Sequence, residues 1–452
     1  MEELTIESLD GQARGLAHRA GKTVFVEGAL PGERVTVATL RGGARHDVAR
    51  IDELRHASSQ RVEPRCASFG VCGGCVMQHL EPAAQVAVKQ RLLEDAFARV
   101  ALKPRRILPP LQGLAWGYRH RARLKVHVLP GAGRVIIGFH QRNSSYIADI
   151  QACHVLPARV AGLLAPLRAL VAGMSAPDRI PQIEVAVGDA AIALVLRHLT
   201  PLLGRDLDRL REFGRRHAIV WWLQAGGPQT AMPLDQEDAD ALAYGLPEFG
   251  LRIAYRPTDF TQVNPLVNRA LVSRAVALLD AQPGDRVADL FCGLGNFTLP
   301  LATRARAVVG IEASAALIER ARKAAAAHGL DGRVRFEARN LFELDAQGLR
   351  SMGRYDRMLM DPPREGARAV AEALARLDSW ERPARIVYVS CNPLTLARDA
   401  AILVHTGRYR LGSAGVINMF MHTAHVESIA VFDHGGPGGG EGADNRMPRG
   451  IA

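Results

Sequence analysis

The sequence predicts an α/β protein made of three successive parts: a small β-barrel, a central α+β part and a C-terminal parallel sheet covered by helices. From about residue 256 onward, apolar strand-like runs alternate with amphipathic helical segments. This alternation is typical of a parallel sheet with helices on both faces. The first 58 residues instead form short apolar runs between glycine and proline turns, as expected for a small barrel of about five strands.

Composition and length agree with several globular domains. The chain has 452 residues, of which 48% are hydrophobic and 23% charged, and roughly 100–200 residues make one domain. No apolar run reaches the roughly 18 residues of a membrane span. The acidic start MEELTIESLD lacks the apolar core of a secretory signal. We therefore expect a cytoplasmic monomer that does not bind membranes.

Changes in sequence pattern along the chain set the expected domain boundaries. Barrels like the one expected at the N-terminus often bind oligonucleotides. The last residues are rich in glycine and poor in apolar side chains, which indicates disorder. We expect a barrel over 1–58, a central part over 59–255, the C-terminal sheet over 256–433 and a disordered tail over 434–452.

Positive charge is concentrated in one segment. The chain carries 57 Lys and Arg against 46 Asp and Glu, a net charge of +11, and residues 96–148 contain no Asp or Glu at all. Lys and Arg that neutralise phosphates supply most non-specific affinity for nucleic acids. The sequence therefore predicts a nucleic-acid partner. Arg119, Arg121 and Arg123 alternate along one expected strand and are expected to share a face, as a phosphate track would require.

Four of the six cysteines form a pattern. Cys66, Cys72 and Cys75 lie in CASFGVCGGC, and Cys153 follows in QACHVL. Four thiolates at such spacing suit either tetrahedral zinc or an iron–sulfur cluster. The spacing alone leaves that choice open.

A glycine loop predicts a nucleotide-like cofactor. DLFCGLGNF follows an expected strand, and Gly293 and Gly295 permit a tight turn with close backbone approach to a ligand. The next strand ends at Glu312, where a carboxylate can accept hydrogen bonds from ribose hydroxyls. The loop lacks a third glycine in register and any following GKS or GKT, so it fits a pyrophosphate poorly. S-adenosylmethionine is the better candidate.

Three reactive side chains are expected near this cofactor. Asp361 in MDPPREG and Cys391 in VSCNP end two further strands, at the sheet edge where ligands bind, and Glu427 follows in HTAHVES. A thiolate that adds to carbon 6 of uracil activates carbon 5 toward a methyl donor, and a base must then remove the proton from carbon 5. We expect Cys391 as nucleophile, Glu427 as base and Asp361 as an orienting group.

Together these motifs resemble a known family. CASFGVCGGC, YRHRARL, GFHQRNS, DFTQVN, DLFCGLGNFTLPLA, YVSCNP and HTAHVE are similar to those of the RNA uracil-5-methyltransferases, specifically the bacterial 23S ribosomal RNA members. The resemblance implies an N-terminal TRAM domain, which is an OB-like β-barrel that binds RNA. It also implies a central iron–sulfur domain and a C-terminal class I, Rossmann-like methyltransferase domain. The implied partner is 23S ribosomal RNA rather than DNA.

The resemblance also assigns roles to individual residues. The implied cofactor-binding residues are Gln262, Phe291, Asn296, Glu312, Asn340 and Asp361. The implied catalytic residues are Cys391 and Glu427. The implied ligands of a [4Fe-4S] cluster are Cys66, Cys72, Cys75 and Cys153. One departure is Met421, which replaces the proline of the family's usual MFPHT and predicts a less rigid loop before Glu427.

Three alternatives can be weighed against this interpretation. An amino-group methyltransferase would normally carry an aromatic residue after DPP, where this chain has Arg364, and would not need a cysteine. A non-catalytic RNA-binding assembly factor would not need Cys391, Glu427 and the glycine loop together. A tRNA uracil-5-methyltransferase would share the chemistry, but the resemblance implies that such relatives lack the cysteine set.

Overall fold

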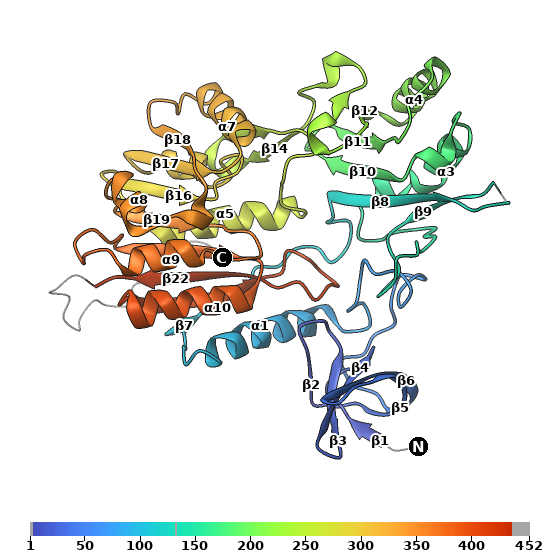
Figure 1. The fold of residues 1–452 in the computed structure, drawn as a ribbon, viewed down its shortest axis with the longest axis horizontal. Coiled ribbons are helices and arrows are strands. Elements are labelled where there is room, and N and C mark those ends of the chain that lie inside the picture. The colour runs from blue at the N-terminus through green and yellow to red at the C-terminus, as the bar shows by residue number, and fades with distance from the viewer. Residues whose placement is uncertain (1–2, 132, 436–452) are drawn as a thin grey trace.

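The computed structural model describes residues 3–131 and 133–435. The disorder expected over 434–452 therefore falls almost entirely outside the described residues. Within the described part, three larger sheets follow one another along the chain and occupy separate regions of the molecule (Figure 1). None of the described helices is long and apolar enough to cross a membrane.

The first sheet has six strands in the order β1-β5-β6-β4-β3-β2. Its strands are β1 (Glu3–Thr5), β2 (Ser8–Leu9), β3 (Gly15–Arg19), β4 (Lys22–Glu27), β5 (Arg34–Gly42) and β6 (His46–His56). The sequence predicts about five strands, whereas the structure has six, because residues 3–9 form two short strands, β1 and β2. Alternating apolar residues such as Val24 and Val26 face a small core, as the twofold period of a strand requires.

The second sheet lies in the central part and has the order β13-β12-β11-β10-β8-β9. Its strands are β8 (Arg121–Val128), β9 (Val135–Gly138), β10 (Gln182–Val187), β11 (Ile192–Arg197), β12 (Ile219–Gln224) and β13 (Met232–Pro233). The helices in this part are α2 (Ala158–Ala161), α3 (Leu164–Ala172) and α4 (Gly204–His217). Trp221 and Trp222 are buried in β12. A separate hairpin, β14 (Ala243–Leu246) and β15 (Leu251–Ala254), leads to the third sheet.

The third sheet carries the expected alternation and has eight strands in the order β18-β17-β16-β19-β20-β22-β21-β7. The strands are β7 (Arg106–Ile107), β16 (Arg286–Leu290), β17 (Ala307–Glu312), β18 (Val334–Ala338), β19 (Arg357–Met360), β20 (Arg385–Ser390), β21 (Arg410–Ile417) and β22 (Glu427–Asp433). Strands β16 to β20 are parallel, and β22 runs antiparallel to both β20 and β21. From β16 the sheet grows in both directions, with β17 and β18 on one side and β19 and β20 on the other. Open α/β sheets bind ligands at such a switch point.

Helices cover both faces of this sheet, as predicted. They are α1 (Pro82–Ala98), α5 (Pro265–Leu279), α6 (Thr298–Ala302), α7 (Ala315–Ala327), α8 (Ala346–Ser351), α9 (Arg368–Ala375) and α10 (Pro393–Ala401). The remaining helical segments in the described part of the chain are five short 3-10 helices and one π-helical turn that follows α10. They are η1 (Pro177–Arg179), η2 (Pro228–Thr230), η3 (Gln236–Asp238), η4 (Pro247–Phe249), η5 (Leu341–Glu343) and the π-helical η6 (Ile402–Thr406). The apolar side chains of α5 and α7 belong to one core, and those of α1, α9 and α10 belong to another.

Two early segments belong structurally to this late sheet. Helix α1 packs against α10 and β21 (Figure 1), and β7 pairs in parallel with β21 at the sheet edge. Both segments precede the central sheet in the chain. The order of segments in the sequence therefore does not match their grouping in space.

The cap of helix α10 fixes the position of Cys391 at the carboxyl edge of the sheet. The Asn392 side chain caps α10 by accepting a hydrogen bond from the backbone N–H of Leu394 at 3.1 Å, and Pro393 occupies the first helical turn. Both features are typical helix starts. Cys391 is thereby fixed between the end of β20 and the start of α10.

Candidate active site

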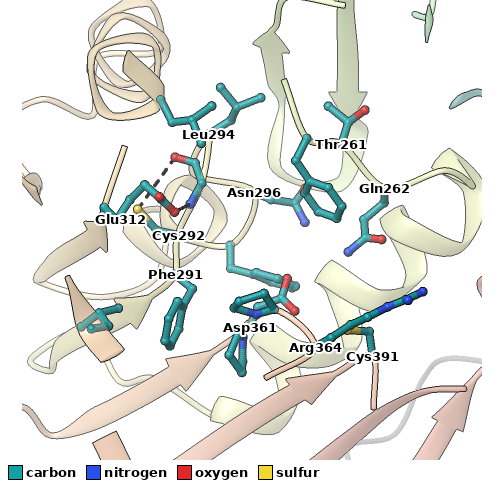
Figure 2. Close-up of a pocket in the computed structure, with 18 of the residues that line it drawn as sticks. Thr261, Gln262, Phe291, Cys292, Leu294, Asn296, Glu312, Asp361, Arg364 and Cys391 are labelled. Atoms are coloured by element: carbon teal, nitrogen blue, oxygen red, sulfur yellow. Dashed lines mark hydrogen bonds between the residues drawn. The ribbon is translucent and has the colours of Figure 1, made fainter. Parts of the chain in front are cut away.

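A cavity of about 490 Å³ lies at the carboxyl edge of the parallel strands (Figure 2). Its walls come from the segments that follow β16, β17, β18, β19 and β20, from the connection between β21 and β22 with the start of β22, and from the segment before α5. All the expected cofactor and catalytic residues line it: Gln262, Phe291, Asn296, Glu312, Asn340, Asp361, Cys391 and Glu427. In Figure 2, Glu312 and Cys391 mark opposite ends of the cavity, with Asp361 between them.

The glycine loop forms one end of the cavity. Gly293 and Gly295 adopt φ values of 54° and 85°, and Phe291 adopts 63°, so the loop turns sharply through the left-handed region that glycine tolerates best. Glu312 holds this turn, since its carboxylate accepts hydrogen bonds from the backbone N–H of Gly293 at 3.3 Å and of Ser314 at 2.9 Å. Glu312 also lines the cavity, and its carboxylate has acceptor capacity beyond these two bonds, as a ribose-binding carboxylate requires.

Polar and aromatic groups continue the wall. The Asn296 and Asn268 side chains exchange two hydrogen bonds of 3.0 Å each. The Tyr244 hydroxyl donates to the same Asn296 oxygen at 3.1 Å. The rings of Phe291 and Phe342 lie 5.6 Å apart. This wall combines flat apolar surfaces with a few fixed polar atoms, which suits an aromatic base joined to a sugar.

The reactive groups lie at the other end of the cavity, and their protonation is shifted. Burial raises the pKa of Glu427 to about 7, although the cations Arg364 and Lys89 oppose this. Burial, followed by the charge of Glu427, raises the pKa of Asp361 well above its usual range. Burial and these two carboxyls raise the pKa of the Cys391 thiol to about 11, against the effect of Arg364. Strongly shifted groups that share one cleft are typical of active sites.

Arg364 and His425 are functional candidates that the sequence analysis did not select. The Arg364 backbone carbonyl accepts hydrogen bonds from Asn392 at 3.1 Å and from Thr395 at 3.2 Å. Its guanidinium donates to the His425 ring at 3.0 Å. Arg364 lies beside Cys391 (Figure 2), where a cation favours a thiolate. The sequence signal that could have identified Arg364 is its position directly after the DPP turn.

The cavity opens into a much larger groove of about 1170 Å³. Arg364, Cys391, Phe420 and His425 line both hollows. The groove also includes residues of the N-terminal sheet, the cysteine loop, α1 and the central part. Cys391 therefore lies where a deep cofactor-sized cavity meets a wide groove lined by residues from the N-terminal, central and C-terminal parts of the chain.

The predicted phosphate track on β8 needs correction. Arg121 is half-buried, and Arg123 pairs with Glu184 at 3.0 Å. The acid that pairs with Arg123 and the residues that cover Arg121 belong to other elements, and the periodicity of the strand cannot reveal them. Only Arg119 of this trio lines the groove, where it is joined from the same acid-free segment by Arg99 and Arg142.

The four cysteines of the expected metal site converge. Cys66, Cys72, Cys75 and Cys153 line one small pocket of about 20 Å³. Burial raises the pKa of the Cys72, Cys75 and Cys153 thiols, in the case of Cys75 to about 12. Across residues 3–131 and 133–435, however, no group of three or more His, Cys, Asp or Glu side chains is arranged closely enough to hold a metal ion.

Known proteins match this chain along almost its whole length. The model of the tRNA (Uracil-5-)-methyltransferase family matches residues 234–434. The 23S rRNA (uracil(1939)-C(5))-methyltransferase of Bordetella bronchiseptica is 67% identical, over 96% of this chain and 93% of its own length. The enzyme of the same name from Aromatoleum aromaticum is 55% identical, over 96% of this chain and all of its own length.

A solved structure supports the fold. The tRNA (uracil-54, C5)-methyltransferase of Pyrococcus abyssi, in complex with S-adenosyl-L-homocysteine, aligns with a TM-score of 0.72 over 95% of this chain and 100% of its own chain, at 21% identity. It shows that the present chain has the fold of such enzymes. On the strength of the close sequence relatives, this chain belongs to the family of S-adenosylmethionine-dependent RNA uracil-5-methyltransferases.

Proposed function

We propose that this enzyme methylates carbon 5 of a uridine in 23S ribosomal RNA, at the position corresponding to uracil 1939 of its relatives' substrate. The observation that carries the proposal is the junction at Cys391, where a cofactor-sized cavity meets a groove wide enough for a polynucleotide. The ribosomal relatives are 53–67% identical, whereas the tRNA enzyme of known structure is 21% identical. These figures favour ribosomal RNA over the tRNA alternative.

S-adenosylmethionine would be held by the residues of the glycine-loop end. Glu312 offers its carboxylate to the ribose hydroxyls, Phe291 and Phe342 offer ring surfaces to the adenine, and Gln262, Asn296, Asn340 and Asp361 supply polar atoms along the wall. The sulfonium of this cofactor supplies an electrophilic methyl group. The polar and apolar lining fits such a ligand, because it combines a carboxylate for hydroxyls with flat surfaces for a purine.

The residues of the opposite end would carry out the chemistry on uracil. Cys391 adds to carbon 6 as a thiolate, which makes carbon 5 nucleophilic toward the methyl group. Arg364 stabilises the thiolate during this attack. Glu427 then removes the proton from carbon 5, so that the double bond reforms and the sulfur leaves carbon 6. A carboxyl with a pKa of about 7 is well matched to a base that works near neutral pH.

The RNA would lie in the groove. Its target base must leave the stack to bring carbon 6 to Cys391, at a cost of a few kcal/mol. Arg99, Arg119 and Arg142 line the groove and would hold the flanking phosphates. The six-stranded N-terminal sheet also lines it, and we assign it the role of a TRAM domain that grips RNA.

We further propose that Cys66, Cys72, Cys75 and Cys153 hold a [4Fe-4S] cluster with a structural role. Two observations support a metal centre: the four side chains line one pocket, and the pKa values of the Cys72, Cys75 and Cys153 thiols are raised by burial first and by neighbouring cysteines second. A positive centre would relieve this repulsion, because metals bind the thiolate form. To bind the cluster, the four cysteine side chains would have to lie closer together than they do in this structure. Cytoplasmic location, a monomeric state and the lack of DNA binding stay predictions.

Covalent trapping tests the proposed function. A 23S RNA fragment with 5-fluorouridine at the target position should form a protein–RNA adduct that survives denaturing gels, since fluorine cannot be removed as a proton. The Cys391→Ala variant should form no adduct and no product, while its affinity for S-adenosylhomocysteine stays within about twofold of wild type. A matched tRNA substrate that is methylated in preference to the 23S fragment would contradict the ribosomal assignment.

A further inference from the structure

Helix α1 contains a lysine with almost no access to solvent. Lys89 is 1% exposed, and lysine is rarely so buried unless it has a specific partner. Its ammonium donates hydrogen bonds to the Asn418 side-chain oxygen at 2.8 Å and to the Phe420 carbonyl at 2.7 Å. Both acceptors lie in residues 418–426, which connect β21 to β22 and directly precede Glu427, the first residue of β22.

A second buried side chain of α1 holds the same connection. The Gln85 side-chain oxygen accepts a hydrogen bond from the His422 backbone N–H at 2.9 Å. Its amide nitrogen donates to the carbonyls of Met77 and Leu80 at 2.9 Å and 2.8 Å. Gln85 and Lys89 are one helical turn apart and therefore face the connection together. Phe420 and His425 within that connection form part of the cavity wall beside Glu427.

The two side chains differ in charge. Four charged or titratable groups around Glu427 influence it or respond to it: the cations Lys89 and Arg364, and the acids Asp361 and Cys391. The connection also presents His422 and His425, whose pKa values burial lowers to about 4, so both rings are neutral near pH 7. Arg364 is exposed and engages His425, so Lys89 is the buried cation of this group. Both hydrogen-bond acceptors of Lys89 are neutral. Burial lowers its pKa to about 7, and Glu427 is the group that favours its charged form.

We propose that Lys89 is a positioning residue of the methyl-transfer reaction, which holds the connection that frames Glu427 and supplies a buried positive charge that keeps Glu427 ready to accept a proton. This inference rests on the proposed role of Glu427 as the base. The helix that carries Lys89 lies outside the catalytic part of the sequence. It is brought to the site by its packing on β21 and α10.

The test separates the two halves of the reaction. Adduct formation on 5-fluorouridine RNA requires attack and methyl transfer but no proton removal, whereas turnover of natural RNA requires all the steps. We expect Lys89→Met to form the fluorouridine adduct within about twofold of the wild-type rate. The rising limb of its turnover–pH profile should move up by roughly one pH unit, because an opposite charge nearby lowers a carboxyl pKa by about that much. At pH 7 this shift corresponds to about a fivefold loss of turnover and to accumulation of the methylated adduct on natural RNA.

Gln85→Met is the matched control, since it removes hydrogen bonds to the same connection and leaves the charge unchanged. Its turnover should fall by the same factor at every pH, and the rising limb of its turnover–pH profile should stay at the wild-type pH. Lys89→Gln removes the charge but keeps a donor, so it still reports on the charge if Lys89→Met folds poorly. If the rising limbs of the turnover–pH profiles of wild type and both Lys89 variants lie at the same pH, the proposal is refuted. Failure of the wild type to form the fluorouridine adduct would instead refute the proposed function.

Discussion

Replacement of Glu427 by glutamine should make the protein more stable and almost inactive. The side chain is 5% exposed, and burial raises the pKa of its carboxyl from 4.5 to about 7. Glutamine has nearly the same shape and cannot ionise. The variant therefore removes a buried charge without leaving a cavity.

The magnitude follows from proton linkage. Below pH 4.5 the carboxyl is protonated in both the folded and the unfolded chain, so its ionisation costs no stability. Between pH 4.5 and about 7 the unfolded chain releases the proton first, and the folded state progressively loses stability. Above pH 7 this loss is constant. A rise from 4.5 to about 7 corresponds to about 3 kcal/mol at roughly 1.4 kcal/mol per pKa unit. Since the variant also deprives Lys89 of an attractive neighbour, we expect a gain of about 1–3 kcal/mol.

Denaturation at several pH values measures this gain. Urea midpoints of wild type and Glu427→Gln should differ most at pH 8 and converge toward pH 5. Glu365→Gln serves as the control, because Glu365 is exposed and its charge is solvated in the folded chain. In parallel, turnover should fall by roughly 10²–10⁴-fold, the usual contribution of a general base, with the methylated RNA adduct accumulating on natural substrate. Equal stability of the two proteins at pH 5 and pH 8, or normal turnover, would refute the reasoning.

Three further predictions address the other parts of the molecule. Glu312→Gln should weaken binding of S-adenosylhomocysteine about tenfold in calorimetry, because a charged acceptor for the ribose is lost, and unchanged affinity would remove Glu312 from the cofactor site. Protein purified without oxygen should be brown, with about four iron and four sulfide ions per chain, whereas a colourless protein with one zinc would exclude the cluster. Combined replacement of the groove arginines by glutamine should flatten the dependence of RNA affinity on salt by a slope of roughly one per lost phosphate contact, and an unchanged slope would place the RNA elsewhere; the arginines are Arg99, Arg119 and Arg142.

The catalytic sheet was predictable because its signals are local. Most of the parallel strands are largely apolar runs, and β20 (Arg385–Ser390), for example, is followed directly by α10, whose start Asn392 caps. The reactive residues follow these strands directly. Since the carboxyl ends of parallel strands meet at one edge, the convergence of Asp361 and Cys391 followed from strand order alone.

The remaining features depend on tertiary contacts that periodicity does not encode. The amphipathic pattern of residues 85–100 predicts a helix. It does not indicate that this helix, α1, packs on α10 and β21, which lie roughly 300 residues later in the chain. Lys89 on that helix looks like an ordinary surface lysine until the packing buries it. In the same way, Arg123 appeared free to bind phosphate until β10 placed Glu184 beside it.

The connection before Glu427 illustrates how one local rule can be replaced by tertiary contacts. Proline in the family's usual motif restricts the backbone by its ring, and the present chain has Met421 there instead. The structure restrains this turn in another way, because the Met421 carbonyl accepts a hydrogen bond from the buried Tyr118 hydroxyl at 2.7 Å. The next residue, His422, adopts a φ of 62° and its carbonyl accepts hydrogen bonds from the N–H groups of Val76 and Met77 at 2.8 Å and 3.0 Å. The cysteine loop, α1 and the central part therefore all contact this turn, so the rigidity that the proline would provide comes from neighbouring segments of the fold.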